Sequence, residues 1–433
     1  MESTPSLTID RLSALAPDER ARLLRRVGNN PETVAPVVRE IIADVRERGD
    51  AALFEHTLRL DGAQMERLEV SADEYQDALR SVSPGVLRAL QVAIDNIERF
   101  HRTHLQPQPV VETMPGVRVW REWRPIERVG LYVAGGKAAY PSSLLMQAVA
   151  ARVAGCSSVI ACSPPDRAGL LPAEMLAAAS LAGVHRFFKI GGAQAVAAMA
   201  YGTETVPQAW KLYGAGSVWV TAAKLAVFGD ADIDLPAGPS EILIIADETP
   251  EPALLAADLV AQAEHGPDSA AVLLTTSTTI AEGVAAEVAR QLASLPLGER
   301  AGQALRTYGR ILLVDTMHEA VQFSNEYAPE HLEIATAEPE RLLPLISNAA
   351  SIFLGVHTPV ASGDYATGSN HVLPTGGAAR TFGPLSVESF GRWVQVQSVS
   401  RDGLLGLRES VVALAEAEGL EGHARSIDVR FER

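Results

Sequence analysis

Strand-like and helix-like patterns alternate along the middle of this chain. The alternation runs through residues 129–133, 142–153, 159–162, 173–182 and 187–190, and on to a helix that ends at 200. A repeated strand–helix order requires parallel strands joined by right-handed crossovers. A second unit of the same kind occupies residues 242–246, 252–265, 271–275, 280–293, 311–314, 341–347 and 351–354. We therefore predict an α/β protein with two parallel sheets.

Helices and one hairpin are predicted around these two units. Helical patterns occupy residues 18–26, 31–48, 51–60, 84–104 and 404–418, and a capping box at Ser71 opens another helix. Residues 110–113 and 117–123 flank a Met-Pro-Gly turn and predict a β-hairpin. The charged helix at 18–26 has little stability of its own, so it must dock on something to persist.

The bulk composition argues against several classes of partner. A formal charge of −16 disfavours nucleic acid and anionic membranes, because both require a basic patch. Two cysteines cannot form a disulfide framework, and residues 1–10 do not resemble a secretory signal. No uncharged apolar run is long enough to span a bilayer. We expect a soluble, acidic, cytoplasmic protein whose 433 residues form two or more domains.

A carboxylate and an imidazole stand side by side at Glu330 and His331, directly after Pro329. Proline biases the preceding Ala328 toward an extended conformation. An imidazole titrates near neutrality and suits taking a proton from an alcohol, while a carboxylate can activate water. The same residues also suit a polar turn before a strand. The pair is therefore a candidate catalytic site, to be weighed with the rest of the chain.

Glycine pairs at Gly135-Gly136 and Gly191-Gly192 occupy predicted strand-to-helix turns. Ligands of parallel α/β sheets bind outside the carboxyl ends of the strands, where bare N–H groups can meet a phosphate. The G-x-G-x-x-G dinucleotide fingerprint is absent, because Gly214-Ala215-Gly216 is followed by Trp219 at its sixth position. These turns suggest a nucleotide, although a Gly-Gly pair after a strand is more often only a tight turn.

Several polar side chains in the second half could bind a metal. Gln262 and His265 are three residues apart and would share one helix face. Asp364 lies in a predicted turn, and His423 follows the last predicted helix. Oxygen and imidazole ligands suit a borderline cation such as Zn²⁺. The spacing matches no standard zinc motif, and each histidine, His371 included, could instead be a structural hydrogen-bonder.

A catalytic cysteine is disfavoured. Cys156 precedes a predicted buried strand and Cys162 ends it, and neither has a basic neighbour in sequence. Buried small hydrophobic residues are the better interpretation of both.

These motifs together resemble one family, the L-histidinol dehydrogenases. The resemblance covers residues 30–430, and its marks are Gly130–Val133, Gly191–Ala195, Val220–Lys224, Ala237–Glu241, Gln262–His265, Asn325–Glu333, Gly363–Ala366, Asn370–Thr375, and Glu418–Leu420 with His423. Nine matches in the same order are far more specific than any one motif.

The resemblance implies a role for each matching residue. Glu330 and His331 would be catalytic. One Zn²⁺ per subunit would be held by Gln262, His265, Asp364 and His423. Substrate contacts would come from Ser240, Gln262, His265, His331, Asp364, His371, Glu418 and His423. NAD would be contacted by Tyr132, Gln194 and Ser217. Ser217 stands where the family usually has the longer side chain of asparagine.

The implied reaction is an NAD- and zinc-dependent four-electron oxidation of L-histidinol, through L-histidinal, to L-histidine. His331 would take the alcohol proton, and Glu330 would activate water to attack the aldehyde. This is the last step of histidine biosynthesis. The partner subunit would supply the residue equivalent to His423, with Glu418 near it, which makes a homodimer necessary for activity.

The resemblance also implies an architecture of two Rossmann-like domains in an intertwined homodimer. Residues 1–29 would form an N-terminal arm, and 383–433 a helical C-terminal dimerisation segment. Residues 30–129 and 241–382 would form a discontinuous domain that carries the catalytic pair. Residues 130–240 would be an inserted NAD domain.

Three alternatives remain open. The same scaffold could oxidise another polar alcohol such as a sulfonated diol, although a carboxylate at Glu418 suits a cationic amino alcohol better. A zinc-dependent hydrolase could use Glu330 as its base, and an absence of NAD binding would favour it. A non-catalytic binding protein fits poorly with the adjacent acid and imidazole.

Overall fold

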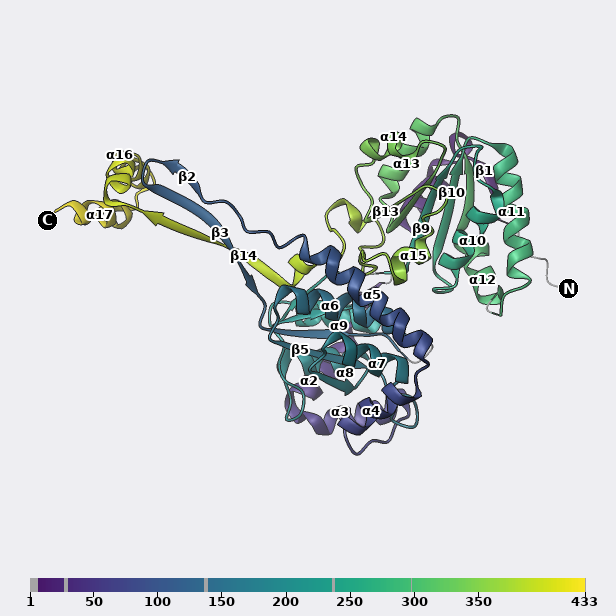
Figure 1. Cartoon of the computed structure of the whole chain (residues 1–433), viewed down its shortest axis with the longest axis horizontal. Coiled ribbons are helices and arrows are strands. Elements are labelled where there is room, and N and C mark those ends of the chain that lie inside the picture. Colours follow the sequence, from purple (N-terminus) through teal and green to yellow (C-terminus); the bar gives the residue numbers. More distant parts are fainter. Residues whose placement is uncertain (1–6, 27–29, 136–138, 236–237, 297, 433) are drawn as a thin grey trace.

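The computed structural model describes residues 7–26, 30–135, 139–235, 238–296 and 298–432. Two bodies, each built on a parallel sheet, lie side by side, and a long arm projects from them (Figure 1). Gly136 of the first glycine pair and Ala237 of the motif before Glu241 lie outside the described residues. No helix in the described part of the chain is long and apolar enough to cross a membrane.

The first body is built on a parallel sheet with the strand order β1-β11-β10-β9-β12-β13 among the described residues. Its strands are β1 (Ile9–Arg11), β9 (Glu241–Ala246), β10 (Ala270–Thr275), β11 (Gly309–Leu313), β12 (His331–Ala335) and β13 (Ser351–Leu354). One face is covered by α10 (Pro252–Ala263), α11 (Thr278–Leu292) and α12 (Gly298–Tyr308). The other is covered by α1 (Pro17–Arg25), α13 (Met317–Tyr327) and α14 (Pro339–Leu342). Both faces of the central strands are therefore buried, which explains their continuous apolar sequences.

The second body has the strand order β6-β5-β4-β7-β8 among the described residues, and all its pairs are parallel. Its strands are β4 (Arg128–Tyr132), β5 (Ser158–Ser163), β6 (Arg186–Lys189), β7 (Lys211–Tyr213) and β8 (Asp232–Ile233). The connecting helices are α6 (Pro141–Ala154), α7 (Ala173–Ala182), α8 (Gly192–Tyr201) and α9 (Val218–Val227). The prediction of two parallel sheets is confirmed.

Four N-terminal helices complete the second body rather than the first. They are α2 (Ala35–Arg48), α3 (Asp50–Asp61), α4 (Ala72–Ser81) and α5 (Pro84–Arg102). The apolar faces of α2 and α3 join the core around α8 and α9, and those of α4 and α5 join the core around α6 and α7. This packing differs from the expected division, which grouped residues 30–129 with the catalytic sheet. Apolar spacing shows which face of a helix is buried but not which sheet buries it.

The N-terminal segment, expected to form an arm, packs on the first body. Strand β1 adds an edge to the sheet of that body by pairing with β11, and Leu23 and Leu24 of α1 pack on the core of the same sheet. The charged helix thus docks as predicted, on the first body.

The projecting arm is a three-stranded antiparallel sheet with two helices at its tip (Figure 1). Strands β2 (Val111–Met114) and β3 (Val117–Pro125) form the predicted hairpin, and β14 (Gly391–Val399) pairs along the whole length of β3. The helices are α16 (Arg401–Ala417) and α17 (Glu421–Asp428). Strand β14 was not predicted, because its residues are only partly buried and give no continuous apolar run.

Candidate active site

The candidate catalytic residues Glu330 and His331 lie at the amino end of β12, beside the amino end of β9. His331 is the first residue of β12 and pairs in register with Ile242 of β9, while Glu330 lies just before it. The general rule that places ligands at the carboxyl ends of parallel strands therefore does not describe the position of this pair. In the second sheet Tyr132 ends β4 and Gly191 follows β6, so both lie at carboxyl ends. The two bodies meet where the Ser143 hydroxyl of α6 lies 3.0 Å from His371 Nε2.

The path into the pair also differs from prediction. Ala328 is not extended but left-handed, with φ +48°, and its N–H donates to the Ser324 carbonyl to end α13. The need to close the helix outweighs the bias that Pro329 imposes on its neighbour.

The Glu330 carboxyl is held by a chain of hydrogen bonds. Its Oε2 accepts from the Ser240 hydroxyl at 2.6 Å and from the Glu241 N–H at 2.7 Å. Gln262 Nε2 donates in turn to the Ser240 hydroxyl at 2.8 Å. Burial raises the pKa of Glu330 to about 8, while these donors and the His265 imidazole oppose the rise. Glu330 therefore changes charge close to physiological pH.

The tautomer of His331 is set by its neighbour in β9. Its Nδ1 lies 3.0 Å from the Glu241 carbonyl oxygen, which can only accept, so Nδ1 carries the proton. Its Nε2 is then an unprotonated, buried atom that has no hydrogen-bond partner among the described residues. Nε2 lies 3.8 Å from Asp364 Oδ1. Burial lowers the pKa of His331, although the Asp364 carboxylate opposes that shift. The imidazole is therefore neutral and free to accept a proton.

The expected metal ligands are only partly assembled by one chain. Gln262 Oε1 is buried with no hydrogen-bond partner among the described residues, and Asp364, at the end of the short helix α15 (Val360–Tyr365), faces His331. His265 lies beyond the end of α10, so the predicted helix to 265 is two residues too long, but its N–H still bonds to the Gln262 carbonyl. No cluster of three His, Cys, Asp or Glu residues suited to a metal occurs in the described ranges.

The remaining substrate residues fall into two groups. His371 belongs to the assembled site, because its Nδ1 donates to the Asp364 carbonyl at 2.7 Å. Glu418 and His423 do not, because Glu418 is exposed in the turn after α16 and His423 is exposed on α17, at the tip of the arm and away from Glu330 and His331 of their own chain (Figure 1).

The expected cofactor residues gather at the carboxyl ends of the second sheet. The Tyr132 hydroxyl accepts from the Gly192 N–H at 3.1 Å, at the start of α8. Gly192 has φ +60°, which a residue with a side chain rarely adopts. Gln194 is buried on α8, and its Oε1 has no hydrogen-bond partner among the described residues. Ser217 precedes α9 and is exposed. The N-terminus of a helix is a type of site that suits a phosphate.

Two residues near the site escaped sequence reasoning. Glu241 was seen only as part of a motif, and Arg26 only as the end of a charged helix. They form a buried ion pair, with Arg26 Nε 2.7 Å from Glu241 Oε2. No local pattern links them, because they are far apart in the sequence; the one signal available was a carboxylate placed at the start of an apolar strand.

Both cysteines are unsuited to catalysis, as predicted. Each is buried, and burial raises the pKa of Cys156 to about 12 and that of Cys162 further still.

We predict that Ellman's reagent will leave the native protein almost unmodified and its activity intact, and will titrate both thiols after unfolding in guanidinium chloride. Rapid loss of activity in parallel with one modified thiol in the native protein would contradict this.

A buried imidazole whose Nε2 has no hydrogen-bond partner among the described residues, beside a buried carboxyl group in an α/β fold, is the arrangement of side chains that suits proton transfer in an enzyme. The histidinol dehydrogenase family model matches residues 24–431 of the chain. Histidinol dehydrogenase of Methanosarcina mazei is 45% identical over 97% of both chains. That of Xanthomonas oryzae pv. oryzae is 49% identical over 92% of this chain and 94% of its own.

A solved structure agrees with these relatives. The crystal structure of histidinol dehydrogenase from Elizabethkingia anophelis aligns with a TM-score of 0.95 and 38% identity, over 100% of this chain and 99% of that one. The chain belongs to the histidinol dehydrogenase family, and it is an oxidoreductase.

Proposed function

We propose that this enzyme oxidises L-histidinol through L-histidinal to L-histidine, with NAD as the oxidant and Zn²⁺ bound at the site. The observation that carries the proposal is the state of His331. Its Nδ1 is committed to the Glu241 carbonyl, which leaves Nε2 as a buried acceptor beside Glu330. A primary alcohol that is oxidised to an acid needs a proton acceptor for the first step and an activated water for the second, and these two side chains suit those tasks.

His331 acts on the alcohol. Its lowered pKa keeps the ring neutral, so Nε2 can accept the hydroxyl proton as the carbon is oxidised. NAD, when bound, would supply the hydride acceptor for both oxidations. The Asp364 carboxylate, 3.8 Å from Nε2, stabilises the imidazolium that results.

Glu330 acts on water. In its ionised form it takes a proton from a water molecule that adds to the aldehyde carbon, and the hydrate that forms is the substrate of the second oxidation. The Ser240 hydroxyl and the Glu241 N–H hold one carboxylate oxygen and so orient the group. The other oxygen is then available to the water.

A metal fits the residues that line the site. Gln262 presents a buried oxygen without a partner among the described residues, while its nitrogen is held by Ser240. Gln262, His265 and Asp364 would hold Zn²⁺ together with His423 of the partner subunit. When bound, Zn²⁺ would supply a fixed positive point that grips the imidazole and amine of histidinol and orients the reacting carbon. His371 and Glu418 would contribute further substrate contacts.

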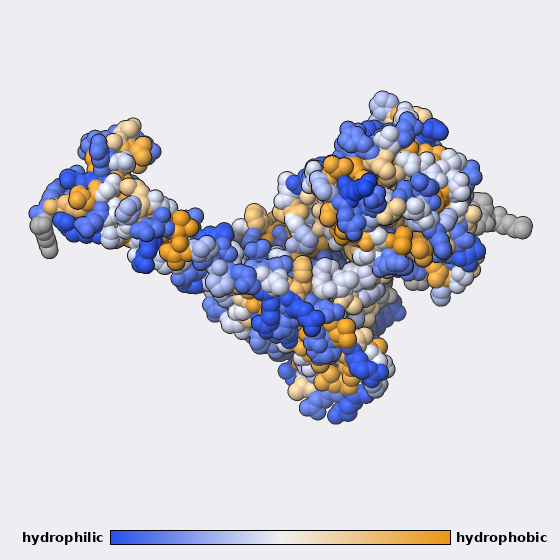
Figure 2. Space-filling view, turned by 45° about the horizontal axis from the view of Figure 1, so that its top comes forward, coloured by the Kyte–Doolittle hydropathy of each residue, from blue (hydrophilic) through white to orange (hydrophobic). Residues whose placement is uncertain are grey.

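The arm suits a homodimer that completes this site. Apolar side chains lie exposed along it, with Val399, Leu405 and Leu414 exposed by 41%, 51% and 66%. Figure 2 shows such patches on the strands and at the tip. An arm with an unburied apolar surface and unused polar residues is suited to docking on a second copy. We therefore infer that Glu418 and His423 reach the site of the partner, and that the second body, around Tyr132, Gln194 and Ser217, binds NAD.

Subunit complementation tests the shared site. Glu330→Gln and His423→Ala homodimers are each expected to form almost no histidine from histidinol. A refolded equal mixture should recover about a quarter of the wild-type rate of histidine formation, because half the dimers are mixed and each of these has one intact site of two. The control is His357→Ala, which changes an exposed histidine outside the proposed ligand set. The His357→Ala homodimer should be fully active without any mixing. A mixture that stays inactive would show that each site draws His423 from its own chain.

A further inference from the structure

An ion pair that joins the N-terminal segment to the catalytic strand is almost completely buried. The side chains of Arg26 and Glu241 are 5% and 2% exposed, and 2.7 Å separates Nε from Oε2. Burial raises the pKa of Glu241 to about 8 and the nearby Glu330 carboxylate adds to the rise, while the Arg26 guanidinium opposes it by favouring the charged form. Such a pair is poor evidence of stability, because desolvation offsets much of its attraction. Its location therefore calls for another explanation.

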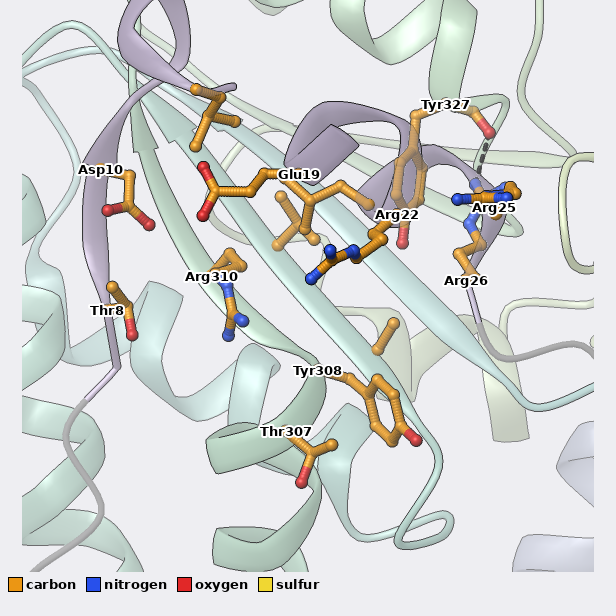
Figure 3. Close-up of a pocket in the computed structure, with 14 residues that line it drawn as sticks. Thr8, Asp10, Glu19, Arg22, Arg25, Arg26, Thr307, Tyr308, Arg310 and Tyr327 are labelled. Atoms are coloured by element: carbon orange, nitrogen blue, oxygen red, sulfur yellow. Dashed lines mark hydrogen bonds between the residues drawn. The ribbon is translucent and has the colours of Figure 1, made fainter. Parts of the chain in front are cut away.

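Arg26 contacts the segment that leads into the catalytic pair. Its guanidinium lies 3.5 Å from the centroid of the Tyr327 ring. It donates to the Tyr327 carbonyl, as Figure 3 shows, and reaches the Ala328 carbonyl at 3.5 Å. Ala328 is the residue in the left-handed region, a conformation that costs an alanine free energy and persists only where its surroundings hold it. Arg26 therefore holds the strained turn that lies two residues before Glu330.

Glu241 contacts both catalytic residues. Its main chain donates to Glu330 Oε2 at 2.7 Å and accepts from His331 Nδ1 at 3.0 Å. Its side-chain Oε1 accepts from the N–H groups of Glu330 and Gly376, each at 3.3 Å. The backbone of Glu241 thus sets the orientation of the acid and the tautomer of the base. Its carboxylate ties the same residue to the Glu330 main chain and to Arg26.

We propose that Arg26 and Glu241 are positioning residues for the catalytic pair, and that the N-terminal segment belongs to the active-site framework. Neither touches the reacting atoms. The proposal rests on the roles of Glu330 and His331 given above. A misplacement of about 1 Å can cost about 10²-fold in rate, so loss of this pair should reduce turnover far more than substrate affinity.

Arg26 lines a cavity of about 630 Å³, and this cavity gives a small guanidinium compound access to the position of the Arg26 side chain. Arg26 and Tyr327 form part of its wall, with Arg22, Tyr308 and Arg310 around it (Figure 3). If the Arg26 side chain is truncated to alanine, methylguanidinium can enter from this cavity and occupy the vacated place between Tyr327 and Glu241. A residue that only supports the fold would not be restored in this way.

The experiment is a comparison of Arg26→Ala with Arg22→Ala. Arg26→Ala should lower kcat by about 10²-fold with KM changed less than about threefold, and millimolar methylguanidinium should restore kcat at least tenfold. Arg22→Ala removes an exposed arginine of the same cavity and should retain wild-type kcat, with no response to methylguanidinium. The proposal would be overturned if Arg26→Ala lost kcat only in proportion to its loss of folded protein, and if methylguanidinium did not restore kcat.

Two further measurements keep the test decisive. Arg26→Ala leaves a buried carboxylate without its cation, so the double variant Arg26→Met with Glu241→Gln removes both charges and should fold while remaining slow. Full kcat in that folded variant would refute a positioning role. Hydrogen exchange of a peptide spanning residues 325–332 should lose protection in either variant relative to wild type. Unchanged hydrogen exchange in both variants would refute the positioning role, and this readout does not depend on the substrate. A wild-type enzyme that does not oxidise histidinol would instead refute the proposed function.

Discussion

Replacing His331 by asparagine is expected to lower kcat for histidinol by about 10²- to 10⁴-fold, the range for loss of a general base. An asparagine amide can still donate to the Glu241 carbonyl, as Nδ1 does now at 3.0 Å. The variant therefore keeps the strand contact and loses only the lone pair at Nε2. KM should change little, because the substrate is held mainly by other groups.

The measurement is steady-state NADH formation with purified variant and wild-type enzyme. His318→Asn is the matched control, because His318 is exposed on α13 and removed from the catalytic pair. It should retain wild-type kcat. A His331→Asn enzyme within tenfold of wild type would remove His331 from the role of base.

The second large effect is expected from Glu330→Gln, and it should fall on one half of the reaction. Glutamine retains an oxygen that can accept from the Ser240 hydroxyl and the Glu241 N–H, so the local structure is preserved. It cannot take a proton from water. Oxidation of histidinal should slow by about 10²- to 10⁴-fold, while the first oxidation is much less affected.

A trap for aldehydes distinguishes this outcome from general inactivation. With such a trap, Glu330→Gln should release histidinal and about one NADH per histidinol consumed, since only the first oxidation proceeds. Glu340→Gln, an exposed change on α14, should behave as wild type. Equal loss of both half-reactions would mean that Glu330 does not act specifically on water.

The pH dependence of the second half-reaction follows from the same residue. Burial raises the pKa of Glu330 to about 8, and the ionised form is the active one. Oxidation of histidinal should therefore rise as pH increases through about 8, and Glu330→Gln should abolish that rise. A profile that falls over this range would contradict the assigned role.

The chain's own pattern was enough to predict two parallel sheets, although not strands β1, β7, β8 and β12. The continuous apolar runs of β9 and β10 and the helix between them are typical of a buried parallel sheet, whereas β12 includes His331 and Glu333 and gives no such run. Helices α12 and α13 were missed, although a start signal at Thr316 was present, because their apolar residues are few. The site residues came mainly from resemblance, since Gln262, His265 and Asp364 match no spacing rule.

What could not be predicted depends on contacts between distant segments. The packing of α2–α5 on the second sheet, the position of the catalytic pair at the amino ends of β9 and β12, and the pairing of Arg26 with Glu241 are all of this kind. A hydrophobic pattern has no information on which partner covers it, and a single charged residue does not indicate its counterion. Only the three-dimensional arrangement joins the N-terminal segment to the site.

The most direct test of the proposed reaction is the number of NADH formed per L-histidinol consumed by the purified enzyme, measured before and after chelation. The account predicts a ratio of about two, because an alcohol taken to an acid loses four electrons and each NAD accepts two. Turnover should be lost on chelation and restored by Zn²⁺. A ratio of one with histidinal as the final product, or turnover that a chelator leaves unchanged, would contradict it.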